Sequence, residues 1–251
     1  MQTLTAELVK LKRSMSWLLV VLLPVVLVLT GSIMTIVEGT GLDDDWQTLW
    51  MRSFVFYGLF PLPVGIAMSA SLVWRPEHRG SNWNALLSGP TSSLRIVVAK
   101  ATSVALLAVV MQLVALGVVA LLGKLVFGLP GFVPPTQLGI FGLIVLACVP
   151  VAALQSWLSM VMRSFAAPVA VAFVGAGLSS ALLVMGLDAV MFVSPYAALT
   201  RATQLGTATF ADTGTIAPAV VVMIAAASLV LTGIATALNT AVLERGEART
   251  G

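Results

Sequence analysis

The chain has 251 residues, of which 59% are hydrophobic and only 9% are charged, and its mean hydropathy is +1.05. Soluble domains carry about 25% charged residues, so this composition excludes a soluble protein and predicts an integral membrane protein. The formal charge of +3 is then no sign of nucleic-acid binding. The single cysteine, Cys148, excludes a disulfide within the chain and a cysteine-based metal site, and its apolar surroundings predict core packing.

Residues 1–14 are predicted to form a short amphipathic helix ahead of the first membrane span. Leucines recur on one of its faces and basic side chains lie at its end: Leu4, Leu8, Leu11, Lys10, Lys12 and Arg13. A basic amphipathic helix of this kind lies in the plane of the membrane interface. We therefore expect an elbow that fixes the first span to the inner leaflet.

Six apolar stretches are long enough to cross a bilayer, which takes about 20 residues of helix. They are Met15–Val37, Ser53–Trp74, Ile96–Leu122, Thr136–Met162, Ala166–Leu187 and Ile216–Ala241. The expected fold is an all-α integral membrane bundle that forms one transmembrane domain over residues 1–251, because lipid cannot satisfy open backbone N–H and C=O groups and a helix pairs them internally. The first stretch is long for a signal peptide and no cleavage site ends it, so we expect a retained span.

The basic residues predict the orientation of the bundle. With the N-terminus inside, ten of the thirteen Lys and Arg are cytoplasmic: Lys10, Lys12, Arg13, Arg75, Arg79, Arg95, Lys100, Arg163, Arg245 and Arg249. Only Arg52, Lys124 and Arg201 remain outside. The positive-inside rule therefore places both termini in the cytoplasm. Near the outer boundary, the rings of Trp46, Trp50 and Phe54 are expected to anchor the second span at the lipid headgroups.

Prolines, small residues and one long loop predict local features of the bundle. Pro61 and Pro63 should break or bend the second span, either as a hinge or as a fixed bend. Small residues spaced four apart allow close helix packing, within the chain or at a subunit interface: Ala172, Gly175, Ala176, Ser179, Ser180, Gly233 and Ala237. The loop Asp188–Thr215 is long enough for a short re-entrant or interfacial helical region before the last span.

The sequence lacks the residues that most enzymes and ion-coupled transporters need. His78 is the only histidine, and no acidic or cysteine cluster accompanies it, so we expect no metal site and no catalytic residue. Gly123-Lys124 lacks the rest of a phosphate-binding loop. The span centres carry no ionisable side chain, and such residues usually mark ion pathways. The chain is therefore either passive or driven by a partner.

The polar segment 75–95 carries a family resemblance. It contains Glu77, Gly80-Ser81, Leu86-Leu87, Pro90 and Ser92, and Lys100 follows in the next span. This order resembles the permeases of type-2 ABC transporters, although Ser81 stands where that family usually has Thr. The amphipathic start and the layout of six spans with both ends inside are also similar to the family. Within it, the chain looks most like the short permeases of bacterial lantibiotic-immunity and peptide-antibiotic exporters.

The resemblance implies that segment 75–95 contains a coupling helix that docks into a groove of a separate ATPase. Ser81 or Asn82 is suited to cap this helix, and Pro90 to end it. Trp83, Leu86 and Leu87 then form an apolar knob. Glu77 and Arg79 flank the knob as a charged rim for the ATPase. The alternative is an ordinary surface helix that packs on its own bundle.

The expected function follows from these readings. The chain would be the permease subunit of an ATP-driven exporter in the bacterial cytoplasmic membrane, and it would move an amphipathic or hydrophobic substrate such as a peptide antimicrobial, a drug or a lipid-like molecule. The expected partners are a cytoplasmic ATPase dimer, which binds ATP and Mg, a second identical or related permease subunit, and membrane lipid, with no nucleic acid and no cofactor in this chain. The alternative is a non-transporting membrane anchor or a subunit of a sensor complex.

Overall fold

The computed structural model describes residues 2–11, 14–37, 46–79, 91–210 and 212–247, and within these ranges the regular secondary structure is entirely helical. The elements are α1 (Gln2–Leu11), α2 (Ser16–Val37), α3 (Trp46–Leu59), α4 (Pro61–Trp74), α6 (Ser93–Leu121), the π-helical turn η1 (Leu122–Val126), α7 (Pro135–Val161), α8 (Ala166–Val184), the 3-10 turn η2 (Asp188–Phe192), α9 (Pro195–Gln204) and α10 (Pro218–Glu247). The prediction of an all-α membrane fold is confirmed.

Five of the described helices are long and apolar enough to cross a membrane by themselves: α2, α6, α7, α8 and α10. The bent pair α3 and α4 makes a sixth span if the two helices cross as one. The helix ends lie within a few residues of the predicted spans, except that α3 begins at Trp46 rather than at Ser53 and α10 ends at Glu247 rather than at Ala241.

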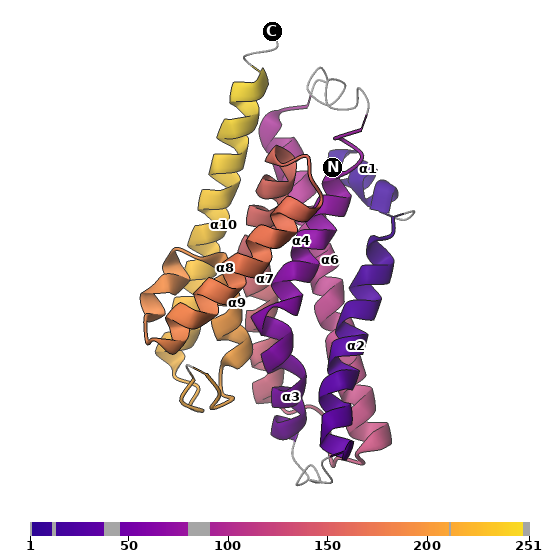
Figure 1. The fold of residues 1–251 in the computed structure, drawn as a ribbon, viewed down its shortest axis with the longest axis vertical. Coiled ribbons are helices and arrows are strands. Elements are labelled where there is room, and N and C mark those ends of the chain that lie inside the picture. The colour runs from indigo at the N-terminus through magenta and orange to yellow at the C-terminus, as the bar shows by residue number, and fades with distance from the viewer. Residues whose placement is uncertain (1, 12–13, 38–45, 80–90, 211, 248–251) are drawn as a thin grey trace.

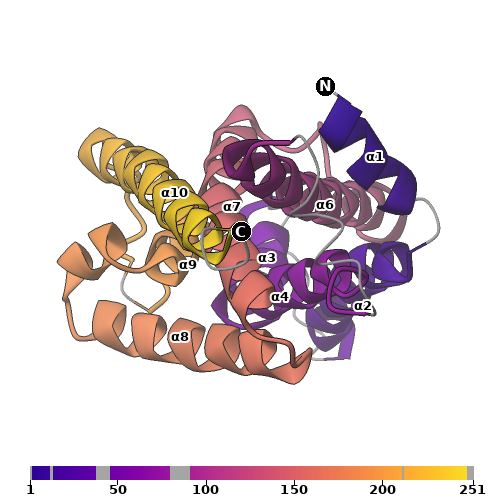
Figure 2. The ribbon, with the colours of Figure 1, turned by 90° about the horizontal axis from the view of Figure 1, so that it is seen from above.

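Helix α7 lies at the centre of the bundle. It packs against α4, α6, α8, α9 and α10, and the other helices surround it when the molecule is viewed along the bundle (Figure 2). Of its apolar span 56% is buried, against 22% for α10 at the edge. Helix α1 and the end of α10 lie at the same end of the bundle (Figure 1). We call this the amino-terminal end, and the sequence predicts that it is cytoplasmic.

The break between α3 and α4 occurs where the prolines predict it. The two helices meet at an angle of 51°. Pro61 occupies the first turn of α4, where its missing N–H leaves no helical hydrogen bond unmade. Leu62 and Pro63 are buried. The bend is thus part of the packed core, while its movement as a hinge stays a prediction.

The prediction that the tryptophans of α3 anchor at the lipid headgroups is wrong. Trp46, Trp50 and Phe54 are 6%, 1% and 0% exposed. The rings of Trp50 and Phe54 stack at a centroid distance of 4.1 Å. Trp46 donates a hydrogen bond of 2.8 Å to the carbonyl of Pro130, and it fits against Gly123, where an added Cβ would lie 2.5 Å from its ring. These aromatic side chains fill the protein core, and the absence of a side chain at Gly123 makes room for Trp46.

The two small-residue patterns face different surroundings. On α8, Ala172 and Ala176 are fully buried, and a Cβ added to Gly175 would lie 2.5 Å from the ring of Tyr196 on α9. The Ser179 hydroxyl lies 2.7 Å from that of Ser194, and Ser180 donates to the Ala176 carbonyl of its own helix. The α8 pattern therefore packs against α9 of the same chain.

On α10, Gly233 and Ala237 are exposed, and a Cβ added to Gly233 would meet nothing within 4 Å. This pattern faces away from the described part of the chain.

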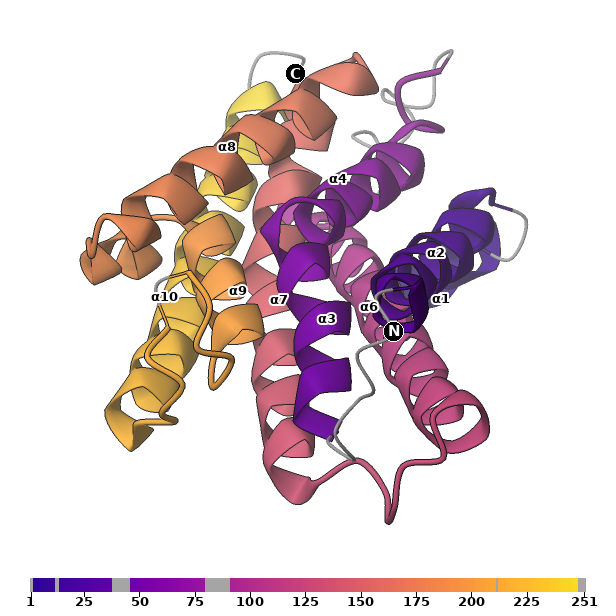
Figure 3. The same ribbon diagram turned by 60° about the horizontal axis from the view of Figure 1, so that its bottom comes forward.

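The predicted helical region before the last span is formed by η2 and α9. Every residue of α9 is buried, although its sequence PYAALTRATQ is largely polar. The helix packs between α3, α7, α8 and α10 (Figure 3). Because it has 10 residues, it is too short to cross a bilayer and re-enters the bundle from the end opposite α1.

Candidate functional site at the amino-terminal end

Four charged side chains meet where α1, the turn after α4 and the first turns of α6 come together. We call this cluster the amino-terminal junction: Glu7, Lys10, Glu77 and Lys100. The helix α4 ends at Trp74, and Pro76 follows in a series of turns that bring Glu77 inward. On α1 the buried positions are Glu7 and Leu11, so the elbow helix docks through a carboxylate as well as through a leucine.

Lys100 is the centre of the junction. Its side chain is 1% exposed, and its Nζ lies 2.7 Å from Glu7 Oε2 and 2.8 Å from Glu77 Oε1. Nζ also donates to the carbonyl of Val73 at 3.2 Å. An ammonium group has three N–H donors, and these three acceptors can take all of them. The buried charge of Lys100 is therefore both neutralised and hydrogen-bonded.

Lys10 closes the junction on the solvent side. Its Nζ lies 2.9 Å from Glu7 Oε1 and 2.8 Å from Glu77 Oε1, and 46% of its side chain is exposed. Burial favours the neutral amine, but hydrogen bonds to Glu77 and Glu7 and their charges outweigh this effect, so the pKa of Lys10 is raised. Lys10 stays charged and bridges two carboxylates.

Glu77 is the carboxylate that both lysines share. Burial favours its neutral form, but the charge of Lys100 and the hydrogen bonds from Lys10 and Lys100 outweigh burial and hold the pKa of Glu77 below its ordinary value. With two carboxylates and two ammonium groups the junction is neutral overall. It joins three elements that are far apart in the sequence.

His78 holds the same turn to a fourth element. Its Nε2 lies 2.7 Å from the backbone carbonyl of Ser159, near the end of α7. A carbonyl only accepts hydrogen bonds, so Nε2 carries the proton. The turn directly before residue 80 is therefore attached to α1 and α6 through Glu77 and to α7 through His78.

A second buried ion pair lies at the opposite end of the bundle. Arg201 Nη1 on α9 lies 2.7 Å from Asp212 Oδ1. The other oxygen of Asp212 accepts hydrogen bonds from the N–H groups of Ala208 and Gly214 at 3.1 and 2.9 Å. Ala208 has a φ of +53°, which is unfavourable for a residue with a side chain. Asp212 therefore stabilises a strained local loop.

The described residues contain no group of three or more His, Cys, Asp or Glu side chains that could hold a metal ion. The charged junction instead connects elements of the same chain, because both oxygens of Glu7 and Oε1 of Glu77 lie within 2.9 Å of a lysine Nζ.

Comparison with protein families decides the class of this chain. A family model described as ABC-2 family transporter protein matches residues 3–179, which include α1, the junction and the first helices of the bundle. The chain belongs to the ABC-2 transporter family. It is a membrane permease of an ABC transporter, a transport component without an ATPase site of its own. No curated protein and no solved structure matches the chain.

The two described residues that are predicted to bind the ATPase differ in exposure. Glu77 is 4% exposed and binds lysines of its own chain, whereas Arg79 is exposed. The remaining predicted contacts lie outside the described residues: Ser81, Asn82, Trp83, Leu86, Leu87 and Pro90. The carboxylate of Glu77 faces the bundle, and contact of Glu77 with an ATPase stays a prediction.

The predicted elbow residues of the ABC-2 permease also differ in exposure. Leu11 is buried, Leu4 is half-buried and Leu8 is 37% exposed. Lys10 belongs to the junction. Lys12 and Arg13 lie outside the described residues. Contact of the elbow with lipid stays a prediction.

Sequence reasoning missed the partners that complete the junction of the ABC-2 permease. From the sequence, Lys100 is placed only in a family pattern, His78 is considered only as a catalytic or metal residue, and Glu7 is given no partner. One signal was available: Lys100 lies within the apolar run of α6, where a charged side chain is expected to be paired.

Proposed function

We propose that this ABC-2 permease is the membrane-spanning subunit of an ATP-driven exporter, and that residues 77–90 transmit force from a separate ATPase to the bundle. The observation that carries the proposal is the position of Glu77. Its carboxylate binds Lys10 and Lys100, only a few residues before the predicted docking knob of Trp83, Leu86 and Leu87. A push on that knob would reach α1 and α6 through ion pairs, and α7 through His78.

Rigid coupling of this kind needs contacts between the elements that do not rearrange when force is applied. Two charge-assisted hydrogen bonds to one buried carboxylate are shorter and stronger than neutral ones. If Glu77 turned outward, the buried ammonium group of Lys100 would lose one of its two carboxylate partners, which is costly. The junction therefore has the stiffness that force transmission requires.

The docking step is tested by substitutions in the knob. Trp83→Asp and Leu87→Asp should abolish co-purification of an ATPase with the tagged permease, while membrane insertion is kept. The matched control is Phe132→Asp, which places the same charge on an aromatic side chain that is 83% exposed at the opposite end of the bundle. Retention of the ATPase by both knob variants would show that the docking surface lies elsewhere.

The substrate we propose is an amphipathic or hydrophobic molecule, such as a peptide antimicrobial of the lantibiotic type, and the pathway forms with a second permease subunit, identical or related. The apolar walls of the spans support this cargo. The complex lies in the bacterial cytoplasmic membrane with both termini in the cytoplasm. Expression of the operon should raise resistance to the cargo, and this protection should disappear when the ATPase is inactivated.

The rival function is a membrane anchor in a sensor complex. It predicts ATPase association without any movement of substrate. Efflux of a labelled peptide from proteoliposomes that contain both subunits distinguishes the two, because an anchor would show no ATP-dependent efflux.

A further inference from the structure

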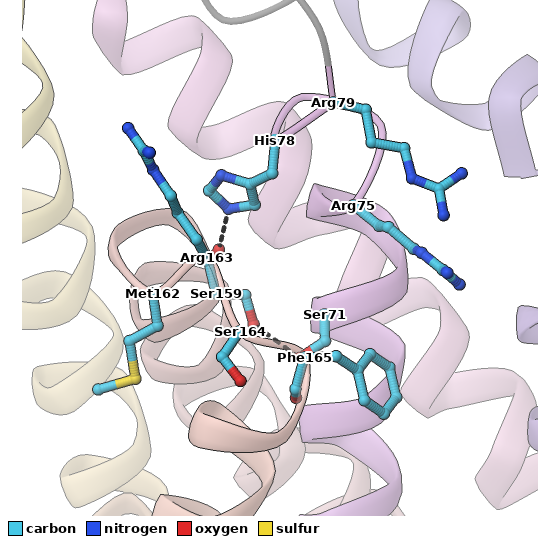
Figure 4. A pocket seen from close by; sticks show the side chains of 9 residues that line it. All are labelled: Ser71, Arg75, His78, Arg79, Ser159, Met162, Arg163, Ser164 and Phe165. Carbon is cyan, nitrogen blue, oxygen red and sulfur yellow. Dashed lines mark hydrogen bonds between the residues drawn. The ribbon is translucent and has the colours of Figure 1, made fainter.

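A pocket lies on the other side of the turn that follows α4, between the end of α4 and the connection from α7 to α8 (Figure 4). Its cavity volume is about 180 Å³. One water occupies about 30 Å³ of liquid, so the pocket has room for a small polar group together with water. It is separate from the junction, because none of the four junction residues lines it.

The lining of this pocket is strongly cationic. Arg75 and Arg79 come from the turn after α4, and Arg163 comes from the α7–α8 connection. None of the lining residues is acidic. Among the described residues no ion pair holds any of these three guanidinium groups. The nearest carboxylate in the sequence, Glu77, is turned to the junction and taken up by two lysines. The positive charge of the pocket is therefore available to a ligand.

The centre of the pocket is polar and held in place. In Figure 4 the arginines extend on both sides of a group formed by His78, Ser71 and Ser159. The hydrogen bond from His78 Nε2 to the Ser159 carbonyl, 2.7 Å long, joins the two walls. The Ser71 hydroxyl lies 3.3 Å from that of Ser159. The floor of the pocket is therefore held by hydrogen bonds between its two walls, and the arginines stand on either side of it.

The pocket also lies where helix α8 begins. Ala166 follows the lining residues directly, and no side chain caps the first turn of this helix. The positive end of the helix dipole adds to the field of the arginines and favours an anion. Apolar side chains border the site, since Val161 is 55% and Phe165 43% exposed. A cationic pocket with an apolar border at the end of a span fits the boundary between lipid headgroups and acyl chains.

We propose that this pocket binds a phosphate group, supplied by the headgroup of an anionic phospholipid in the leaflet at the amino-terminal end or by a soluble phosphate. Guanidinium groups match phosphate oxygens with paired N–H donors. Basic pockets between membrane helices on the cytoplasmic side are suited to anionic headgroups. The exposed apolar border gives the acyl chains a surface, which favours the lipid as the source.

The proposal is tested by binding to the whole protein, delipidated in detergent and measured by native mass spectrometry. The probes are phosphatidylglycerol, phosphatidylcholine and inorganic phosphate. The double variant R75Q/R163Q removes one cation from each wall. Arg79 is kept because it is also proposed to contact the ATPase, so the result does not depend on the proposed function. The control is R95Q, which changes an exposed arginine at the same end that does not line the pocket.

Wild type and R95Q should prefer phosphatidylglycerol over phosphatidylcholine, and R75Q/R163Q should bind phosphatidylglycerol at least about tenfold more weakly, as expected for two arginines near an anionic headgroup. Competition by millimolar inorganic phosphate, lost in the double variant, would assign the site to soluble phosphate instead of lipid and still support the proposal. Equal binding of both lipids and of phosphate by wild type and R75Q/R163Q would overturn it. Loss of ATPase association in R75Q/R163Q with unchanged phosphate and lipid binding would also overturn it, because the pocket would then be a protein-docking surface.

Discussion

At the amino-terminal end Lys100 binds carboxylates from two other elements, whereas at the opposite end Arg201 binds a carboxylate only 11 residues further along the chain. The separation between Lys10 and Glu77 is 67 residues. Apart from Lys10, which is 46% exposed, the side chains of both clusters are buried. Both clusters pair their carboxylates with basic side chains of the same chain. They differ in what they connect, because the first joins α1, α4 and α6, and the second closes one loop.

This difference indicates how force can pass through the ABC-2 permease. A bridge between distant elements makes them move together, while a bridge inside a loop fixes only that loop. The amino-terminal end is therefore built as a connected unit, and the segment predicted to dock the ATPase follows Glu77 directly in the sequence. At the opposite end the ion pair joins residues that are close in sequence, namely α9 and the loop that Asp212 stabilises. Breaking each cluster should give effects of different size and reach.

The largest effect is expected for Lys100→Met. Removing this side chain leaves Glu7 and Glu77 close together and without their buried partner, which costs about 3–5 kcal/mol. The variant should lose thermal stability, and proteolysis should release α1. Adding Glu7→Gln and Glu77→Gln to Lys100→Met should restore part of the stability, because no unpaired charge then remains. A single variant as stable as wild type would show that the junction does not hold these elements together.

Arg201→Met should have a smaller and more local effect. Asp212 keeps its two backbone hydrogen bonds, so the loss is close to that of one charge-assisted bond, about 1.5–3 kcal/mol. Hydrogen exchange should rise in residues 206–214 and in α9 but not in α1. Faster exchange at α1 in this variant would contradict the separation of the two ends.

Acidification should loosen the junction. The pKa of Glu77 is lowered, so its stabilising contribution is complete above the ordinary glutamate value of about 4.3 and is lost as the pH falls through the lower folded value. The pKa of Lys10 is raised, so its contribution is complete below about 10.4 and is lost only at higher pH. Between about pH 5 and pH 10 the junction should be intact.

Proteolysis of α1 followed from pH 7 to pH 3 in nanodiscs measures this dependence. The variant Glu77→Gln serves as the control, since it should remove most of the change with pH. The same pH dependence in the control would assign the transition to another carboxylate.

The smallest effect is expected for Lys10→Gln. Because 46% of the Lys10 side chain is exposed, solvent screens its ion pairs, and the loss should be below about 1 kcal/mol. Thermal melting of this variant beside Lys100→Met compares two lysines that bind the same carboxylates. A loss for Lys10→Gln as large as that for Lys100→Met would show that burial is not what makes Lys100 important.

Hydropathy was enough to predict the helical bundle and the approximate spans, and Pro61 was enough to predict the break in the second span, because each depends on residues that are near in sequence. The junction could not be predicted, since Glu7, Glu77 and Lys100 become neighbours only when three helices pack. The burial of Trp46 depends in the same way on Gly123 across the bundle. The small-residue patterns on α8 and α10 look alike in sequence, yet within the described part of the chain only the α8 pattern meets a partner helix.

The buried helix α9 has a consequence for how the protein is made. With 10 largely polar residues, α9 offers the insertion machinery no segment that would partition into lipid by itself. In the predicted orientation it would be translocated with the connection between α8 and α10 and then dock between helices that are already in the membrane. Its neighbours include α10, which follows it in the chain. The packing of α9 is therefore complete only after α10 has been synthesised, and truncation before α10 should leave α9 open to protease.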